Sequence, residues 1–137
     1  MEAFFPYAAT TVTDFGPVVV RVSPRYLPDQ SDPEGGRWVW SYHIRIENNG
    51  TRDVQLIARH WVITDARGHV EEVEGEGVVG EQPLLEPGQS FDYVSGCPLE
   101  TPSGTMAGSY AFAAEGDLFP VEIPAFSLDS RAERTLN

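Results

Sequence analysis

The sequence predicts an all-β protein, built as a seven-stranded antiparallel β-sandwich. Three observations support this prediction. No stretch of the 137 residues repeats its apolar side chains with the period of a helix. Several stretches instead alternate apolar and polar residues, as a strand with one face in a core does. Clusters of glycine, proline and asparagine separate these stretches at the intervals typical of a sandwich.

The first two predicted strands are residues 18–26 and residues 37–47. In the first, Val18, Val20 and Val22 share one face, and a loop rich in proline and glycine follows at residues 24–36. In the second, alternation is nearly unbroken, so we expect its even-numbered apolar residues to face the core. These residues are Trp38, Trp40, Tyr42, Ile44 and Ile46.

The third predicted strand, residues 53–64, changes phase along its length. Val54 and Leu56 are apolar at even positions, whereas Trp61 and Ile63 are apolar at odd positions. A β-bulge near residues 57–59 accounts for the change, because one extra residue moves the later side chains to the opposite face. A tight turn at residues 65–68 then leads into a short fourth strand, residues 69–74.

Three further strands complete the prediction, at residues 89–95, 105–114 and 118–126. The last of them contains Pro120 and Pro124. Proline lacks the N–H group that a central strand needs, so we place this strand at a sheet edge. We expect a single domain over residues 1–128, with residues 129–137 as a flexible tail and the first dozen residues frayed. A small β-barrel is the alternative architecture.

The charge of the chain argues against several classes of partner. The formal net charge is −12, because the chain has 21 acidic residues and nine basic ones, all of them arginine. Such a surface repels phosphate backbones, so we expect no nucleic-acid partner. The apolar runs are too short to span a bilayer and no signal peptide is visible. We therefore expect a cytoplasmic protein without a membrane partner.

Residues 75–80 have the spacing G-x-G-x-x-G, the pattern of a dinucleotide-binding loop, with Gly75, Gly77 and Gly80 as its glycines. That loop works because its amides lie at the start of a helix. Here valines and prolines follow, and no helix can begin. Glu76 and neighbouring glutamates also repel phosphate. We expect the glycines to let the chain bend over one end of the sandwich, without useful affinity for nucleotides.

Two other groups of residues are candidates for a site. Arg59, His60 and Trp61 follow the predicted bulge, and bulges often direct side chains toward a site. The interpretation that we favour instead buries this end of the strand on both faces, with His60 hydrogen-bonded in or near the core.

The single cysteine, Cys97, lies in an apparent tight loop of glycine and proline. A cysteine nucleophile needs a nearby base and a lowered pKa. His60 is its one plausible partner, and we predict a small buried thiol instead of a nucleophile. The three histidines fall on different predicted strands, so we expect no catalytic set, metal site or cofactor.

Several runs of the sequence are similar to the ApaG family. They include Arg59-His60-Trp61, residues 75–83 with Gln82 near their end, and residues 95–106, which begin Ser-Gly-Cys-Pro-Leu. The resemblance extends over residues 18–126. It implies a fibronectin type III-like or immunoglobulin-like sandwich, in which residues 37–47 and 53–64 lie in opposite sheets. It also implies an association with cobalt and magnesium resistance, and kinship with binding domains of eukaryotic F-box adaptors and a polymerase-interacting protein.

Two functions of different classes are consistent with these observations. The first is a non-catalytic module that contacts an unidentified protein partner through its loops or a sheet edge. The alternative is a small-ligand module, in which residues 75–80 hold a phosphorylated nucleotide or pyrophosphate. Hydrolysis by Cys97 and His60 ranks below both. The candidate binding residues are Arg59, His60, Trp61, Gly75, Glu76, Gly77, Gly80, Gln82 and Cys97.

Overall fold

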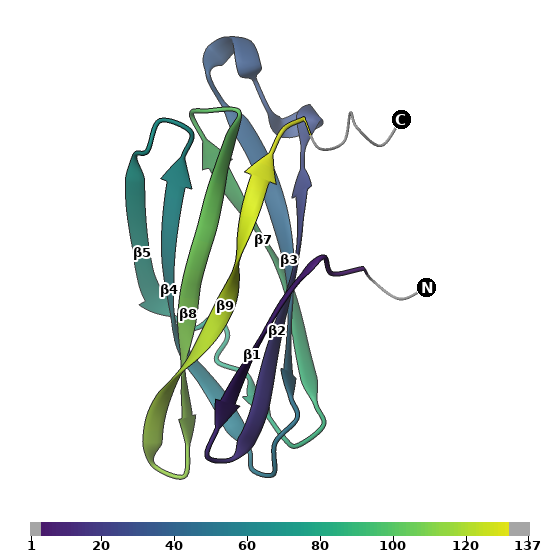
Figure 1. Ribbon diagram of the computed structural model, residues 1–137, viewed down its shortest axis with the longest axis vertical. Helices are drawn as coiled ribbons and strands as arrows, with labels where there is room; N and C mark the ends of the chain where they lie inside the picture. The colour runs from purple at the N-terminus through teal and green to yellow at the C-terminus, as the bar shows by residue number, and fades with distance from the viewer. Residues whose placement is uncertain (1–3, 132–137) are drawn as a thin grey trace.

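Two antiparallel sheets pack face to face in the computed structural model of the chain, which describes residues 4–131 (Figure 1). One sheet has the order β1 (Tyr7–Thr13), β2 (Gly16–Tyr26), β3 (Trp38–Asn48) and β7 (Ser90–Leu99). The other has the order β5 (Val70–Glu76), β4 (Val54–Asp65), β8 (Ser103–Ala114) and β9 (Asp117–Asp129). A short strand, β6 (Leu84–Leu85), pairs with the start of β4. The predicted sandwich is confirmed.

All seven predicted strands are present, but β1 and β6 add to them. The expectation of a frayed N-terminus is wrong for Tyr7–Thr13, which pairs with β2 along its whole length. The Thr11 hydroxyl also accepts a hydrogen bond from the Glu122 amide of β9, at 2.9 Å. β1 therefore contacts both sheets. Its contacts with β2 and β9 stabilise it as a strand, although its apolar and polar residues alternate only weakly. Of the predicted tail, Asp129 ends β9, whereas residues 132–137 lie outside the described part of the chain.

The core lies between the sheets and is rich in aromatic rings. Trp40, Tyr42, Ile44 and Ile46 are buried as predicted, and Trp38 packs partly buried at the core boundary. The rings of Tyr42 and Phe126 lie 5.4 and 5.9 Å from that of Trp61, both in edge-to-face contacts. Aromatic pairs of this geometry contribute beyond the area they bury.

The bulge and the edge strand are both confirmed. The register of β4 against β8 shifts between Leu56 and Ala58, so the extra residue is Ile57. After the shift Trp61 faces the core, like Leu56 before it. Among the strands within residues 4–131, β9 pairs only with β8, so its prolines have no second ladder to disrupt.

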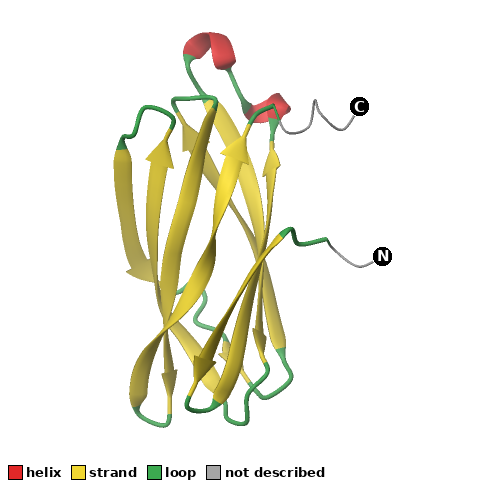
Figure 2. Ribbon diagram, viewed as in Figure 1, coloured by secondary structure: helices red, strands yellow, loops and turns green. Residues whose placement is uncertain are grey.

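The remaining segments are turns and two short 3-10 helices, Pro28–Gln30 and Pro33–Gly35, at one end of the sandwich (Figure 2). β3 and β4 lie in different sheets, so the turn after Asn48 crosses from one sheet to the other, as the family resemblance implies. Across residues 4–131, no helix has the length and apolarity that a membrane span requires.

Candidate functional site

The bulge in β4 anchors the glycine-rich loop. The carbonyl oxygen of Ile57, turned out of the ladder at the bulge, accepts a hydrogen bond from the Gly77 amide at 2.8 Å. It accepts another from the Gln82 side-chain amide at 2.9 Å. The loop is thus held at both ends by one carbonyl group, and it fills the gap along β4 between its partners β5 and β6. The predicted bulge and the predicted loop belong to one structural unit.

Two of the three glycines are needed for the shape of this loop. Gly77 has a φ of +64°, and a Cβ atom there would lie 2.3 Å from the Glu81 carbonyl oxygen. Gly80 has a φ of +81° in a tight turn over residues 78–81, whose other central residue, Val79, has a φ of +44°. A positive φ is costly for a β-branched residue. The neighbouring Val78 is only 1 % exposed, so its insertion between the sheets holds the strained turn in place.

The amides of the loop are largely used within the protein. The Gly77 amide is bonded to Ile57, and the amides of Val78 and Glu81 each donate to the other residue's carbonyl oxygen. A phosphate-binding loop instead presents several free amides to its ligand. The loop therefore lacks the amide cradle that the G-x-G-x-x-G spelling suggests.

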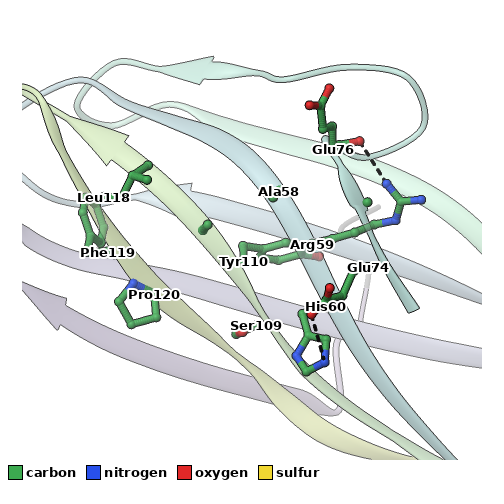
Figure 3. A pocket seen from close by; sticks show the side chains of 12 residues that line it. Ala58, Arg59, His60, Glu74, Glu76, Ser109, Tyr110, Leu118, Phe119 and Pro120 are labelled. Atoms are coloured by element: carbon green, nitrogen blue, oxygen red, sulfur yellow. Dashed lines mark hydrogen bonds and ion pairs between the residues drawn. The ribbon is translucent and has the colours of Figure 1, made fainter. Parts of the chain in front are cut away.

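The third glycine, Gly75, makes room for Arg59. The two residues are directly opposite in the β4–β5 ladder, and a Cβ atom at Gly75 would lie 2.8 Å from the guanidinium group. Arg59 Nη1 donates to the carbonyl oxygen of Glu76 at 3.0 Å (Figure 3). It also donates to the carbonyl oxygen of Gly77 at 3.0 Å. Within residues 4–131, no carboxylate forms an ion pair with this arginine.

Arg59 also borders a cavity between the two sheets, with a volume of about 220 Å³. Tyr42, Tyr93 and Ser95 line this cavity from the opposite sheet, and the turn over residues 78–80 covers it. The Tyr93 and Tyr110 hydroxyl groups are hydrogen-bonded at 2.5 Å. Burial raises the pKa of Tyr42 and of Tyr93, although the Arg59 charge opposes the shift, so both hydroxyl groups stay neutral at physiological pH.

A larger groove, of about 540 Å³, runs over the outer face of β4, β8 and β9 (Figure 3). Its floor is formed by the small side chains of Ala58, Ser109 and Ala111. One wall, on β9, is apolar and includes Leu118, which is 69 % exposed. The opposite wall, on edge strand β5, includes the glutamates Glu74 and Glu76.

The expectation that His60 lies in or near the core is wrong. The side chain of His60 is 36 % exposed and lines the outer groove. Its Nε2 atom lies 2.9 Å from Glu72 Oε1 and 3.9 Å from Glu74 Oε1. The bulge explains the difference, because it directs Trp61 inward and hence places its neighbour His60 on the outer face.

Trp61 and Cys97 are core residues, each about 3 % exposed. Cys97 lies within β7, opposite Trp40, and not in a loop as expected. Burial, with a contribution from Glu71, raises the pKa of its thiol to about 11. His60 lies on the outer face of the other sheet, so the two residues cannot form a nucleophile–base pair. The prediction of a small buried thiol is confirmed.

The structure therefore divides the sequence candidates into three groups. Arg59, Gly75, Glu76, Gly77, Gly80 and Gln82 come together at the loop; His60 faces the outer groove; and Trp61 and Cys97 belong to the core. Sequence reasoning missed Tyr42 and Ser95 at the cavity and Leu118 at the groove. An exposed leucine next to a turn was the one signal available for the last of these.

Comparison with known proteins gives one consistent result. A family profile described as the ApaG domain matches residues 28–114. Protein ApaG of Rhodospirillum centenum is 62 % identical over 112 residues, which cover 81 % of this chain and 86 % of that protein. Protein ApaG of Brucella anthropi is 61 % identical over 122 residues, or 88 % and 94 % of the two chains. Neither name states an enzymatic activity.

A crystal structure titled as the putative ApaA protein from Bordetella pertussis has the same fold. It superposes with a TM-score of 0.81 at 51 % sequence identity, covering 84 % of this chain and 94 % of that one. Both the sequence match and the superposition extend over most of the two sheets. The chain belongs to the ApaG domain family.

Proposed function

We propose that this protein is a non-catalytic, cytoplasmic module that binds a protein partner, and that the outer groove of β4, β8 and β9 receives a basic segment of that partner. The observation that carries the proposal is the contrast between the two walls of the groove. One is apolar and exposed at Leu118; the other carries the acidic side chains of β5. A lysine or arginine side chain matches both walls, because its alkyl stem packs on apolar surface while its charged end stays hydrated.

The charge of the whole chain supports this choice of partner. A protein with a net charge of −12 attracts a basic segment from a distance and repels an acidic one. Glu74 is 80 % exposed, and its carboxylate lies 3.9 Å from His60, so it can turn to a partner. Glu72 is 65 % exposed and contacts His60 at 2.9 Å. The link to cobalt and magnesium resistance, which the family resemblance implies, then acts through that partner instead of through a metal site.

A peptide titration tests the proposal. The probe is a 12-residue peptide of alternating leucine and arginine, added to ¹⁵N-labelled protein, with a leucine–glutamate peptide of the same length as the control probe. We expect saturable shifts of the Ala58, Ala111 and Leu118 amides with the basic peptide only. The double variant Glu74→Gln/Glu76→Gln is expected to weaken binding, whereas Glu34→Gln/Glu86→Gln, which removes the same charge elsewhere, leaves the site intact.

Two results would overturn the proposal. One is an equal response to the acidic peptide. The other is equal weakening by the two double variants, since this would show that only net charge matters. Adding salt separates the contributions further, because screening weakens the charge contacts and leaves apolar contacts at Leu118.

The loop amides do not favour the alternative of a nucleotide-binding module, since three of them are bonded within the protein. We therefore expect ATP with Mg²⁺ to leave the Gly75, Gly77 and Gly80 amide signals unmoved. Saturable shifts at these glycines that disappear in Gly77→Val would favour the nucleotide module instead.

A further inference from the structure

We infer that the cavity between the sheets is a binding site for one compact oxyanion, a carboxylate or a phosphate group, held by Arg59 together with the hydroxyl groups of Ser95 and Tyr42. This site lies between the sheets, whereas the proposed peptide groove lies on the outer face of β4, β8 and β9, and Arg59 borders both. The inference does not depend on the proposed partner. It uses side chains of both sheets, whereas a nucleotide loop would use backbone amides.

The first argument is the state of Arg59. Its Nη1 atom is fixed by the carbonyl oxygens of Glu76 and Gly77, while Nε and Nη2 have no hydrogen-bond partner within residues 4–131. Other arginines of the described residues do reach a carboxylate, such as Arg21 with Glu47 and Arg52 with Glu115. A positioned guanidinium group without a carboxylate partner is suited to a bidentate oxyanion.

The second argument is the lining of the cavity. Ser95 and Tyr42 lie directly opposite each other in the β3–β7 ladder and line the same wall, and Tyr93 lies beside them. The raised pKa values of both tyrosines keep them protonated, so they present donors and no competing negative charge. The carboxylates of Glu74 and Glu76 lie on the other side of the sheet, by the outer groove.

The third argument is size. A cavity of about 220 Å³ holds roughly seven water molecules at their volume in the liquid. This is room for one oxyanion with some of its hydration, and too little for a nucleotide. The turn that covers the cavity contains Val79, whose strained φ of +44° is maintained by the buried Val78 beside it. Strain of this kind clusters at binding sites.

The test uses ¹⁵N-labelled full-length protein and follows the Arg59 Nε–Hε signal, which is assigned by its absence in Arg59→Gln. Sodium phosphate and sodium acetate are titrated separately, each against sodium chloride at matched ionic strength. We expect a saturable shift with at least one of the two. A response to phosphate alone identifies a phosphate group as the ligand, and a response to acetate identifies a carboxylate. No difference from chloride in either titration overturns the inference.

Variants separate this site from general charge effects. Ser95→Ala is expected to weaken the oxyanion by roughly five- to tenfold, as for the loss of one hydrogen bond, and to leave peptide binding in the outer groove unchanged. Arg52→Gln removes the same charge at an exposed pair with Glu115 and is expected to have no effect. Equal weakening by Ser95→Ala and Arg52→Gln would overturn the inference.

A third variant, Gly75→Ala, displaces the guanidinium group without removing it. The added Cβ atom would lie 2.8 Å from the end of the Arg59 side chain, which is flexible enough to move. We expect a folded protein whose Arg59 signal no longer responds to the oxyanion. An unchanged response in Gly75→Ala would show that the position of Arg59 does not matter, and this also contradicts the inference.

Discussion

The surroundings of a single residue in this protein depend mainly on the sheet face on which its side chain lies. On β4, Arg59 and Trp61 face inward while His60, between them, faces outward. The inward residues meet tyrosines and the aromatic core, and the outward residue meets the glutamates of β5. Three consecutive residues thus belong to a cavity, a groove and a core, and substitutions there should have separable effects.

Trp40 is a core residue, only 1 % exposed. Trp40→Ala should reduce the free energy of unfolding by about 3–5 kcal/mol, because it removes a large aromatic ring and leaves a cavity. Urea denaturation measures this loss. Val94→Ala is the control on the neighbouring strand: Val94 is 59 % exposed, and we expect a change within about 0.5 kcal/mol. A loss below about 1 kcal/mol for Trp40→Ala would contradict its place in the core.

The thiol of Cys97 gives a second prediction for a single residue. With its pKa raised to about 11, it is almost entirely protonated at pH 7, and it is also shielded by the core. Iodoacetamide should label the native protein slowly and the urea-unfolded protein fast. Because Cys97 is the only cysteine, intact mass reports the reaction directly. Rapid stoichiometric labelling of the native protein would show that the thiol is accessible and activated.

At the scale of elements, the bulge in β4 and the glycine-rich loop depend on one another. The bulge frees the Ile57 carbonyl oxygen, and the loop satisfies it through Gly77 and Gln82. The loop in turn inserts Val78 between the sheets. This edge of the sandwich is therefore closed by a loop that replaces part of a strand, and the glycines are required by its geometry.

Two glycines of the loop form a matched pair for a test. Both have positive φ, so either alanine variant bears the cost of a left-handed residue, about 1–2 kcal/mol. Only at Gly77 does the new Cβ atom also clash, at 2.3 Å from the Glu81 carbonyl oxygen, whereas at Gly80 it meets nothing within 4 Å. Thermal unfolding should show a clearly larger loss for Gly77→Ala than for Gly80→Ala. Equal losses would mean that the loop is not packed as described.

At the scale of the whole molecule, the surface charge is unevenly placed. Glu72, Glu74 and Glu76 line the outer side of β5, while on the other sheet Asp92 is shared by His43 and Arg45. Asp92 links β7 to β3, with a contact of 2.6 Å to His43 Nε2 and one of 3.0 Å to Arg45 Nε. The glutamates of β5 are thus largely exposed, whereas Asp92 is paired with two basic side chains.

The Asp92 cluster makes stability depend on pH in the acid range. Partial burial raises the pKa of Asp92, but the hydrogen bonds and charges of Arg45 and His43 outweigh it and lower the pKa below the ordinary value. The unfolded chain then binds more protons than the folded one, so this contribution is full above the unfolded pKa of about 3.9 and is lost as pH falls through the folded pKa. Chemical denaturation from pH 6 to pH 2 measures the loss.

The matched variants are Asp92→Asn and Glu122→Gln. Asp92→Asn should be less stable at pH 6 and show a flatter decline toward low pH. The carboxylate of Glu122 forms no ion pair within residues 4–131. The Glu122→Gln variant should therefore show the same decline of the free energy of unfolding with pH as the wild-type protein. Parallel curves for the wild type and Asp92→Asn would show that the cluster contributes nothing.

The sequence by itself determined the features that are encoded locally. Alternation along β3 assigned its buried face, the change of phase in β4 located the bulge, and Pro120 and Pro124 placed β9 at an edge. These three features depend on the two-residue period of a strand or on the missing N–H group of proline. Both properties can be read from the local sequence, without knowing which distant residues are in contact.

Only the tertiary structure decided what depends on partners far apart in the chain. The sequence of β1 alternates only weakly, and its contacts with β2 and β9 hold it in place. Strand β7 continues through Cys97 because this part of the chain pairs with β3. The cavity joins Arg59 to Ser95 and Tyr42 across the two sheets, although no local pattern relates them. The physical reason is that a strand's own period fixes which residues share a face, whereas sheet order and packing fix what that face meets.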